Sequence, residues 1–329
     1  MIEIVQSGPL NTVQDLGRPG YRAIGVSASG AMDPLSVRLG NALLGNEQGA
    51  AAIEVQTFPF IVRFSVAADF VVTGAEGDRL LNDRALIAWC IHRAAAGDVL
   101  EIRQPRQGSR AYIAVGNGVD VPVVMGSRST TLRGGFGGHC GRPLAAGDTL
   151  SVMPASDALP RRSIAVVEPA LGLKAVFPAM ANDTLLVRAV PAGEHELFGA
   201  DADRFWTQPW RISSQSDRTG YRLSGEPIKP EAPVEMRSHG VVPGVVQVPP
   251  SGEPIIQMSD ANTAGGYPKI AGVIEGDLWR LGQARIGTKI QFVRSTHAEA
   301  RAVEQAVDRY VADVSRTAEM IRRALGVIA

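Results

Sequence analysis

The residue types best suited to chemistry gather in one short stretch near the C-terminal end, residues 259–269. Asp260, Tyr267 and Lys269 place a carboxylate, a phenol and an amine within ten residues, which supplies a candidate base and two candidate hydrogen-bond donors. The pair Gly265-Gly266 lies between them, and such backbone lets amide N–H groups approach a ligand closely. Asp, Asn, Gly and Pro are also common turn residues. The residues alone therefore leave a binding site and a structural turn both open.

Two apolar runs position this stretch. Residues 245–248 and 254–258 flank Pro-Pro-Ser-Gly at 249–252, an order that predicts a strand, a tight turn and a second strand. Gln247 lies on the first predicted strand, and Asn262 follows the second. Both are candidate ligand contacts, because an amide side chain offers a donor and an acceptor.

A second candidate feature occurs twice. Segments 14–22 and 215–222 share the order Gln, Asp, Arg, Gly-Tyr-Arg, and two similar modules packed together would place such turns beside an interface cleft; a chance match is the alternative. Arg18 and Arg218 are candidate binders of a carboxylate or phosphate, since a guanidinium pairs with these groups in two-pronged fashion. Asp15 is close enough to Arg18 to brace the turn as an ion pair, and a ligand role is the alternative.

A glycine-dense loop covers residues 134–142. It lacks the Gly-Lys-Ser/Thr ending of a P-loop, so a Walker-type nucleotide site is excluded there. Its flexible amides, with Arg128, Arg133 and Arg142, suit a carboxylate or phosphate; a mobile loop over the mouth of a barrel is the alternative.

The histidines and cysteines give no further site. His139 and Cys140 are adjacent, so their side chains should diverge, which argues against a thiolate–imidazolium pair. The five histidines and two cysteines show no His-x-x-x-His or Cys-x-x-Cys spacing, and we expect no metal site.

Composition bounds the class of protein. The 329 residues carry 33 basic and 33 acidic side chains, so no long-range field should recruit nucleic acid or anionic lipid. No apolar run approaches the roughly 20 residues of a membrane helix. Two cysteines without a paired motif indicate a reducing cytoplasm with both thiols free. A chain without net charge often depends on a partner or on self-association for solubility, and we expect a partner subunit or a homo-oligomer.

The predicted elements are mostly short strands. Between residues 53 and 102 they recur about every ten residues, which favours a β-sandwich or barrel. The predicted strands there are 53–56, 60–64, 69–73, 79–81, 85–91 and 99–102, and the predicted helices of the chain are 34–44, 194–206 and 298–325. Asp33 should cap the first helix.

Linker-like composition at 154–162 predicts a boundary between two modules, residues 1–155 and 163–329.

Several of these segments resemble a known family. The sequences of residues 12–33, 126–138, 213–223 and 262–268 resemble the corresponding motifs of the KipA-like family. This family is also called allophanate hydrolase subunit 2 or carboxyltransferase subdomain C. The chain resembles the ATP-dependent 5-oxoprolinase branch most. Where the family has Gln-Thr-Thr-Gly-Gly-Tyr-Pro, this chain has Asn262, a shorter amide, and Ala264, which lacks a hydroxyl.

The resemblance implies a mainly β protein with a few helices, a cyclophilin-like β-barrel and two linked β modules. It also implies a cytoplasmic subunit, inactive alone, that works beside a KipI-like partner subunit and a LamB/YcsF-type partner subunit. In the 5-oxoprolinase branch, 5-oxo-L-proline, ATP and water give L-glutamate. One alternative is the carboxyltransferase half of a urea-carboxylase-like enzyme, with biotin on a separate carrier because this chain lacks Ala-Met-Lys-Met. The other is a regulator that sequesters a KipI-like partner.

Both enzymatic interpretations activate an unreactive amide, which needs a base and oxyanion-stabilising donors. The expected catalytic residues are Asp260, Tyr267 and Lys269. The expected substrate-binding residues are Asp15, Arg18, Arg218, Gln247, Asn262, Gly265 and Gly266. ATP contacts either this chain or a partner subunit.

Overall fold

The structure, a computed structural model, describes residues 1–152, 164–178, 180 and 182–324 of the chain. It divides into two units, and neither is continuous in sequence. Unit 1 comprises Met1–Arg18, Ser29–Gly172 and Asp308–Ala329, and unit 2 comprises Pro19–Ala28 and Leu173–Val307. The predicted linker at 154–162 lies outside the described residues, so that module boundary stays a prediction.

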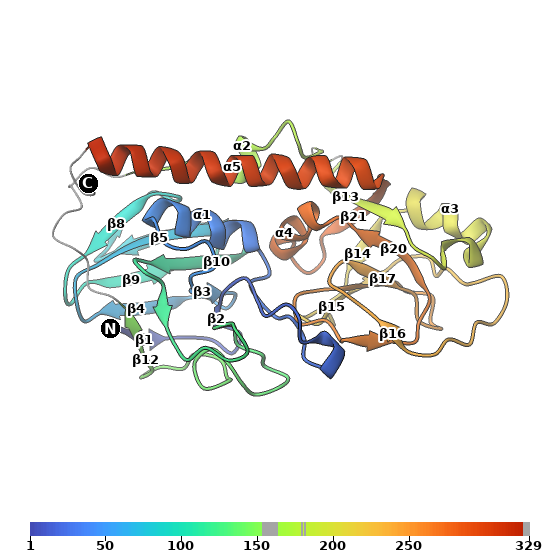
Figure 1. Cartoon of the computed structure of the whole chain (residues 1–329), viewed down its shortest axis with the longest axis horizontal. Coiled ribbons are helices and arrows are strands. Elements are labelled where there is room, and N and C mark those ends of the chain that lie inside the picture. The colour runs from blue at the N-terminus through green and yellow to red at the C-terminus, as the bar shows by residue number, and fades with distance from the viewer. Residues whose placement is uncertain (153–163, 179, 181, 325–329) are drawn as a thin grey trace. The chain divides into compact units, whose positions relative to one another are not determined.

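Unit 1 is built on two antiparallel sheets (Figure 1). The seven-stranded sheet has the order β11 (Val119–Asp120), β12 (Thr149–Val152), β1 (Ile2–Gln6), β4 (Phe60–Phe64), β9 (Val99–Ile102), β6 (Arg79–Leu81) and β7 (Arg84–Ala85). The five-stranded sheet has the order β2 (Thr12–Gln14), β3 (Ala52–Val55), β10 (Gln107–Val115), β5 (Ala68–Glu76) and β8 (Ile91–Ala94).

Alternation of side chains explains the core of this unit. In β4, Phe60, Val62 and Phe64 are fully buried while Arg63 is exposed, as the two-residue period of a strand requires. The equivalent apolar positions of both sheets form one continuous cluster with the residues of β4.

Helix α1 (Pro34–Leu44) begins and ends as the sequence predicts. The Asp33 carboxylate accepts a hydrogen bond from the Ser36 amide at 2.9 Å, and Gly45 closes the helix with φ 71°. The helix packs on β5 and β10. At its end, Arg322 of helix α5 (His297–Ala324) donates to the Leu43 carbonyl, where a cation also complements the helix dipole.

Helix α5 starts with a reciprocal cap. The Thr296 amide donates to the Glu299 carboxylate at 2.7 Å, and the Glu299 amide donates to the Thr296 hydroxyl at 3.2 Å, which is a capping box. A stripe of buried small and branched residues follows along the helix, as its amphipathic pattern predicts. None of the helices in the described part of the chain has the length and hydropathy needed to cross a membrane.

Unit 2 is a closed barrel, which confirms the predicted architecture (Figure 1). Its strands follow the order β13 (Thr184–Pro191), β20 (Lys269–Val273), β17 (Val245–Gln247), β18 (Ile255–Gln257), β15 (Gly220–Ser224), β14 (Trp210–Ile212) and β21 (Lys289–Arg294). Strands β13 and β21 are parallel and the other pairs antiparallel. A separate ribbon pairs β16 (His239–Gly240) with β19 (Ala264–Gly265).

Short helices complete the two units. They are η1 (Arg22–Ile24), α2 (Pro169–Gly172), η2 (His195–Phe198), α3 (Ala200–Thr207) and α4 (Glu275–Gln283). Phe205 of α3 stacks on Phe292 of β21 with ring centroids 4.4 Å apart, and Trp210 lies beside them. Aromatic burial of this kind ties helix to barrel.

Two predicted elements are wrong. The expected strand 85–91 is interrupted, because Trp89 takes a left-handed φ of 56° and β8 starts two residues later. The expected helix 194–206 breaks at Gly199, whose φ of 48° and ψ of −125° separate η2 from α3.

A buried carboxylate joins α4 to the barrel. Asp277 is fully buried and accepts hydrogen bonds from the Arg188 amide at 2.7 Å and from its guanidinium at 2.7 and 3.2 Å. Arg280 lies 3.6 Å away, and both guanidinium groups lie against the Phe177 ring. Removing one partner of such a group leaves a buried charge without compensation.

We therefore expect Asp277→Ala to lower the free energy of unfolding of unit 2 by about 3 kcal/mol. Urea denaturation followed by tryptophan fluorescence measures this, since three of the four tryptophans lie in unit 2. The control is Asp203→Ala, which breaks an ion pair of the same unit whose side chains are 49% and 84% exposed and should change stability by less than about 0.5 kcal/mol. Equal effects of the two variants would contradict the assignment.

Candidate functional site

The strand–turn–strand predicted for residues 245–258 is present. Strands β17 and β18 pair antiparallel with Val246 opposite Ile256, and Gly252 in the turn has φ 83°. The residue types that the sequence singled out for chemistry lie on this hairpin and on the segment that follows it.

Asp260 is held by Arg218. The Arg218 Nε donates to Oδ2 of Asp260 at 2.9 Å and Nη2 to Oδ1 at 3.3 Å. The two residues are only 5% and 8% exposed, and the Asp260 amide also donates to the Arg218 carbonyl at 2.9 Å. A two-pronged pair of this kind fixes the plane of the carboxylate. The structure thus brings together two of the predicted site residues.

Lys269 is held by Glu194, a residue that sequence reasoning missed. Glu194 Oε2 accepts from the Lys269 amide at 3.0 Å, and the Lys269 Nζ lies 3.1 Å from the same oxygen. The two side chains are 16% and 21% exposed. No local pattern identifies Glu194, because it lies 75 residues away along the chain and meets Lys269 only through barrel closure.

A relay of amides lies beside the glycine pair. Gln247 Nε2 donates to the Tyr267 carbonyl at 3.3 Å, and Gln257 Nε2 donates to Gln247 Oε1 at 3.1 Å. Because the Tyr267 carbonyl can only accept a hydrogen bond, Gln247 must direct its NH₂ group toward it and its Oε1 toward Gln257. Gly265 packs directly on the relay, since a Cβ there would lie 2.7 Å from Gln247 Nε2. Gln257 was not predicted; its Oε1 is buried with no hydrogen-bond partner in the described structure.

The remaining predicted residues of this stretch face solvent to a greater degree. Tyr267 is 45% exposed and Asn262 is exposed. Gly266 lies against the Met236 carbonyl, which is 3.2 Å from the position of an added Cβ.

In unit 1, Asp15 accepts several hydrogen bonds. They come from the Gly17 amide at 2.7 Å, the Ser127 hydroxyl at 2.7 Å, and the Arg128 amide and Ser129 hydroxyl at 2.5 Å each. Asp15 is 6% exposed. These contacts join the turn after β2 to the segment before the glycine-dense loop.

Arg18 lies inside unit 1, at 1% exposure. Its guanidinium donates to the Thr131 hydroxyl, to the Ser129 carbonyl at 2.5 Å and to the Val124 carbonyl at 3.4 Å, and its Cζ lies 5.0 Å from the centre of the Phe136 ring. Asp15 and Arg18 both contact Ser129, and the bracing of Asp15 by Arg18 as an ion pair stays a prediction. A ligand role for either residue remains a proposal.

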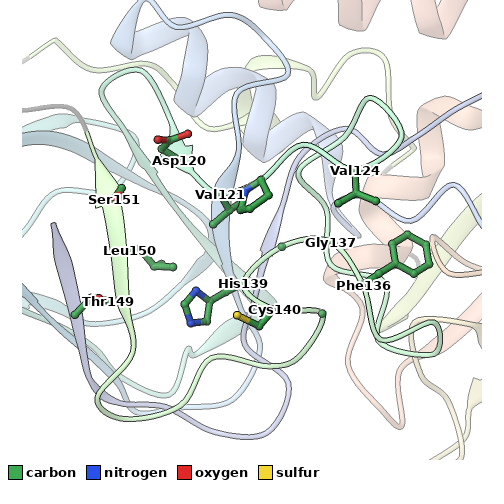
Figure 2. Close-up of a pocket in the computed structure, with 13 residues that line it drawn as sticks. Asp120, Val121, Val124, Phe136, Gly137, His139, Cys140, Thr149, Leu150 and Ser151 are labelled. Atoms are coloured by element: carbon green, nitrogen blue, oxygen red, sulfur yellow. The ribbon is translucent and has the colours of Figure 1, made fainter.

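The glycine-dense loop borders a pocket of about 460 Å³ in unit 1 (Figure 2). Its lining residues are Asp120, Val121, Pro122, Val124, residues 136–141 and residues 149–151. Beside it, Asp148 accepts two hydrogen bonds of 2.7 Å from Arg142 and one of 2.8 Å from the Ala145 amide, and His139 Nε2 lies 3.3 Å from its carboxylate. These interactions, the Arg142 bonds foremost, lower the pKa of Asp148 to about 2.

Among the described residues, no group of three or more His, Cys, Asp or Glu side chains is arranged to hold a metal ion.

The comparison with known families places the chain among carboxyltransferase-type proteins. A family model described as "Carboxyltransferase domain, subdomain A and B" matches residues 24–294, and the chain belongs to this family. The family resemblance predicted from the sequence is confirmed.

Two relatives, each named as the C subunit of 5-oxoprolinase, are similar along nearly their whole length. The chain is 42% identical over 311 residues to the relative from Escherichia coli (strain K12), covering 94% of this chain and 96% of the relative. It is 38% identical over 317 residues to the relative from Haemophilus influenzae, covering 96% and 98%.

The crystal structure of the K. lactis urea amidolyase superposes with a TM-score of 0.85 at 29% identity, covering 95% of this chain and 20% of that one. This chain therefore spans about a fifth of that protein.

Asp148 gives a test of the geometry beside the pocket. We expect Arg142→Ala to raise the pKa of Asp148 from about 2 toward its ordinary value of 3.8. Because the folded-state pKa lies below the unfolded one, this contribution to stability is present above about pH 4 and is lost as the pH falls through 2. A carboxyl-carbon NMR titration measures the shift. Arg133→Ala, at the residue just before this loop, is the control and should leave the pKa unchanged; an equal rise in both variants would contradict the assignment.

Proposed function

We propose that this chain is one subunit of an ATP-dependent enzyme complex that opens the lactam of 5-oxo-L-proline to give L-glutamate. One observation carries the proposal: two relatives named as the C subunit of 5-oxoprolinase match over nearly the full length of both chains. Nearly every part of each relative has a counterpart in this chain, since 96% and 98% of the relatives are covered.

The reaction breaks the ring C–N bond. The carbonyl carbon gains an oxygen from water and the nitrogen gains a proton, while the phosphoanhydride of ATP supplies the driving force. Such a step needs a group that accepts a proton and donors that stabilise the developing oxyanion. Unit 2 offers groups of both kinds. A carboxylate in a fixed orientation can accept a proton, and an amine and the backbone amides of paired glycines can donate hydrogen bonds to the oxyanion.

Within unit 2, we assign Asp260 as base or substrate anchor, oriented by Arg218. Lys269, which lies beside Glu194, and Tyr267 are the proposed donors. The two hydrogen bonds between Arg218 and Asp260 support a positioning role for this arginine, since together they fix the plane of the carboxylate.

The further binding residues are assigned by what they touch. Gln247 supports the ribbon that carries Gly265 through the Tyr267 carbonyl, and Asn262 and Gly266 lie on the same segment. In unit 1, Asp15 and Arg18 hold the base of the glycine-dense loop by their contacts with Ser129. We retain a substrate-binding role for all of these as part of the proposal.

ATP is assigned to a partner subunit. The glycine-dense loop has no Gly-Lys-Ser/Thr ending, and Arg142 is committed to Asp148. The relatives are named as one lettered subunit of an enzyme, which implies partner subunits in their complexes. For this chain we propose a KipI-like partner and a LamB/YcsF-type partner, and no activity alone. The cytoplasmic location stays a prediction.

The alternative function is carboxyl transfer to an amide, as part of a biotin-dependent enzyme. The family description and the superposition on the K. lactis urea amidolyase favour it. Biotin would arrive on another chain, since this sequence has no Ala-Met-Lys-Met segment. The same Asp260 and Lys269 would then face an amide N–H that takes up CO₂.

Reconstitution distinguishes the two functions. We expect the chain, mixed with its KipI-like and LamB/YcsF-type partners, to hydrolyse ATP in a manner stimulated by 5-oxo-L-proline and to release L-glutamate, and the chain alone to release none. Urea with a biotinylated carrier serves as the comparison substrate. Stimulation by urea and the carrier but not by 5-oxo-L-proline would overturn the first function in favour of the second. A stable complex without turnover on either would favour the regulator predicted as the other alternative.

In that complex, Asp260→Asn and Lys269→Met should each lower kcat by at least about 100-fold, the usual size of a lost proton-transfer group. The matched controls are Asp203→Asn, whose side chain is 84% exposed, and Lys229→Met, also exposed. Steady-state kinetics and thermal melting are measured for every variant. Unchanged turnover in folded Asp260→Asn and Lys269→Met would remove this site from consideration.

A further inference from the structure

The glycine-dense loop has an unusual backbone. Gly137, Gly138, Cys140 and Gly141 have φ of 71°, 54°, 56° and 70°. A cysteine in this left-handed region is uncommon, because the Cβ crowds the backbone there. His139 lies between two such residues and is not among those with positive φ. His139 and Cys140 thus pair a residue without positive φ with a left-handed one, and in anion-binding nests such a pairing turns successive N–H groups toward the same side.

The N–H groups of this loop are available as donors. Within the described residues, the amides of Gly137, Gly138, His139 and Cys140 donate no hydrogen bond to protein. The loop is instead closed by bonds that flank them, from the Gly141 amide to the Gly137 carbonyl at 2.8 Å and from the Arg142 amide to the His139 carbonyl at 3.3 Å. Residues 137 and 138 are buried. Buried N–H groups in proteins almost always have an acceptor, so a ligand or water is expected to supply it.

The same four residues line the pocket shown in Figure 2. Its other walls are largely apolar, with Val121, Val124, Phe136 and Leu150 among them. The site thus combines a group of neutral donors with an apolar wall, the combination that fits a small anion with a hydrocarbon body.

Charges near the pocket favour a singly charged anion. Asp148 is paired with Arg142, and Asp120 lies 3.4 Å from Arg128. The guanidinium of Arg18 lies behind the loop, within 2.8 Å of the position of a Cβ added at Gly137. The two carboxylates near the pocket each have a cationic partner. Arg142 and Arg128 are paired with these carboxylates. A phosphate dianion is usually bound by basic side chains, so this pairing favours a singly charged anion over phosphate.

We propose that the loop at 137–140 binds the carboxylate of a small organic acid, with the hydrocarbon part of the acid against the apolar wall of the pocket. The amides of residues 137–140 donate to the carboxylate oxygens. One acid of this class is 5-oxo-L-proline, whose ring is uncharged. The site lies wholly in unit 1, and the proposal does not depend on the proposed function.

The chain contains its own reporter. It has two cysteines, Cys140 in the loop and Cys90, buried elsewhere in unit 1, so selective ¹⁵N-cysteine labelling gives two amide signals. Cys90→Ser assigns them. The chain is titrated with 5-oxo-L-proline, acetate, inorganic phosphate and 2-pyrrolidinone, the last being the same lactam ring without its carboxylate.

We expect a saturable downfield shift of the Cys140 amide proton with 5-oxo-L-proline, a weaker one with acetate, and no shift of Cys90. Acetate lacks the ring carbons that contact the apolar wall, which accounts for its lower affinity. Neither 2-pyrrolidinone nor phosphate should produce a comparable shift.

A pocket-filling variant locates the effect. Ser151 lines the pocket and is exposed, so Ser151→Trp should weaken binding of 5-oxo-L-proline at least about tenfold by occupying the space of the acid. The matched control is Ser65→Trp, at another exposed position of unit 1, which should leave the affinity unchanged.

Several results would overturn the proposal. These are an unmoved Cys140 amide with both acids, an equal shift with 2-pyrrolidinone, a stronger response to phosphate, or equal weakening by the two tryptophan variants. Turnover of the reconstituted complex is measured separately. If the Cys140 amide shifts with 5-oxo-L-proline but the complex shows no turnover, this inference is supported and the proposed function is removed. If the complex turns over but the Cys140 amide does not shift, the proposed function is supported and this inference is overturned.

Discussion

The two-pronged ion pair between Arg218 and Asp260 is the interaction on which the candidate site of unit 2 depends. Both groups are more than nine-tenths buried, so each loses most of its hydration and needs the other to compensate. The bond from the Asp260 amide to the Arg218 carbonyl adds a second tie between the same segments. Strand β19 of the ribbon begins four residues after Asp260, so this pair anchors the chain just before the ribbon.

Unit 1 also has a buried guanidinium, that of Arg18, whose lost hydration must be compensated by protein contacts. The order of residues around Arg18 repeats around Arg218, yet the two arginines have different kinds of partner. Arg18 donates to hydroxyl and carbonyl oxygens and lies against the Phe136 ring, whereas Arg218 pairs with a carboxylate. A short repeat in sequence predicted two turns of similar composition, and the surrounding loops decide what each guanidinium binds. In unit 1, the contacts of Arg18 with Ser129 and Thr131 join the turn after β2 to the segment before the glycine-dense loop.

Local patterns explain which parts of the fold the sequence could predict. Strand β4 and helix α1 were predicted to the residue, because strict alternation in one and an Asp cap with a terminal glycine in the other are local signals. The break at Gly199 and the left-handed Trp89 depend on packing and were missed. Among site residues, Asp260 was named from its type and Arg218 from the repeated order of residues around it. Glu194 and Gln257 could not be, since their partners meet them only when the barrel closes.

The segment around Asp260 is proposed to contact the amide on which the enzyme complex acts. The most direct measurement is a structure of the reconstituted complex with 5-oxo-L-proline and a non-hydrolysable ATP analogue. We expect the lactam to lie within hydrogen-bond distance of Asp260, with Arg218 still paired with the carboxylate. A lactam bound entirely by the partner subunits, with no atom of this segment in contact, would contradict it.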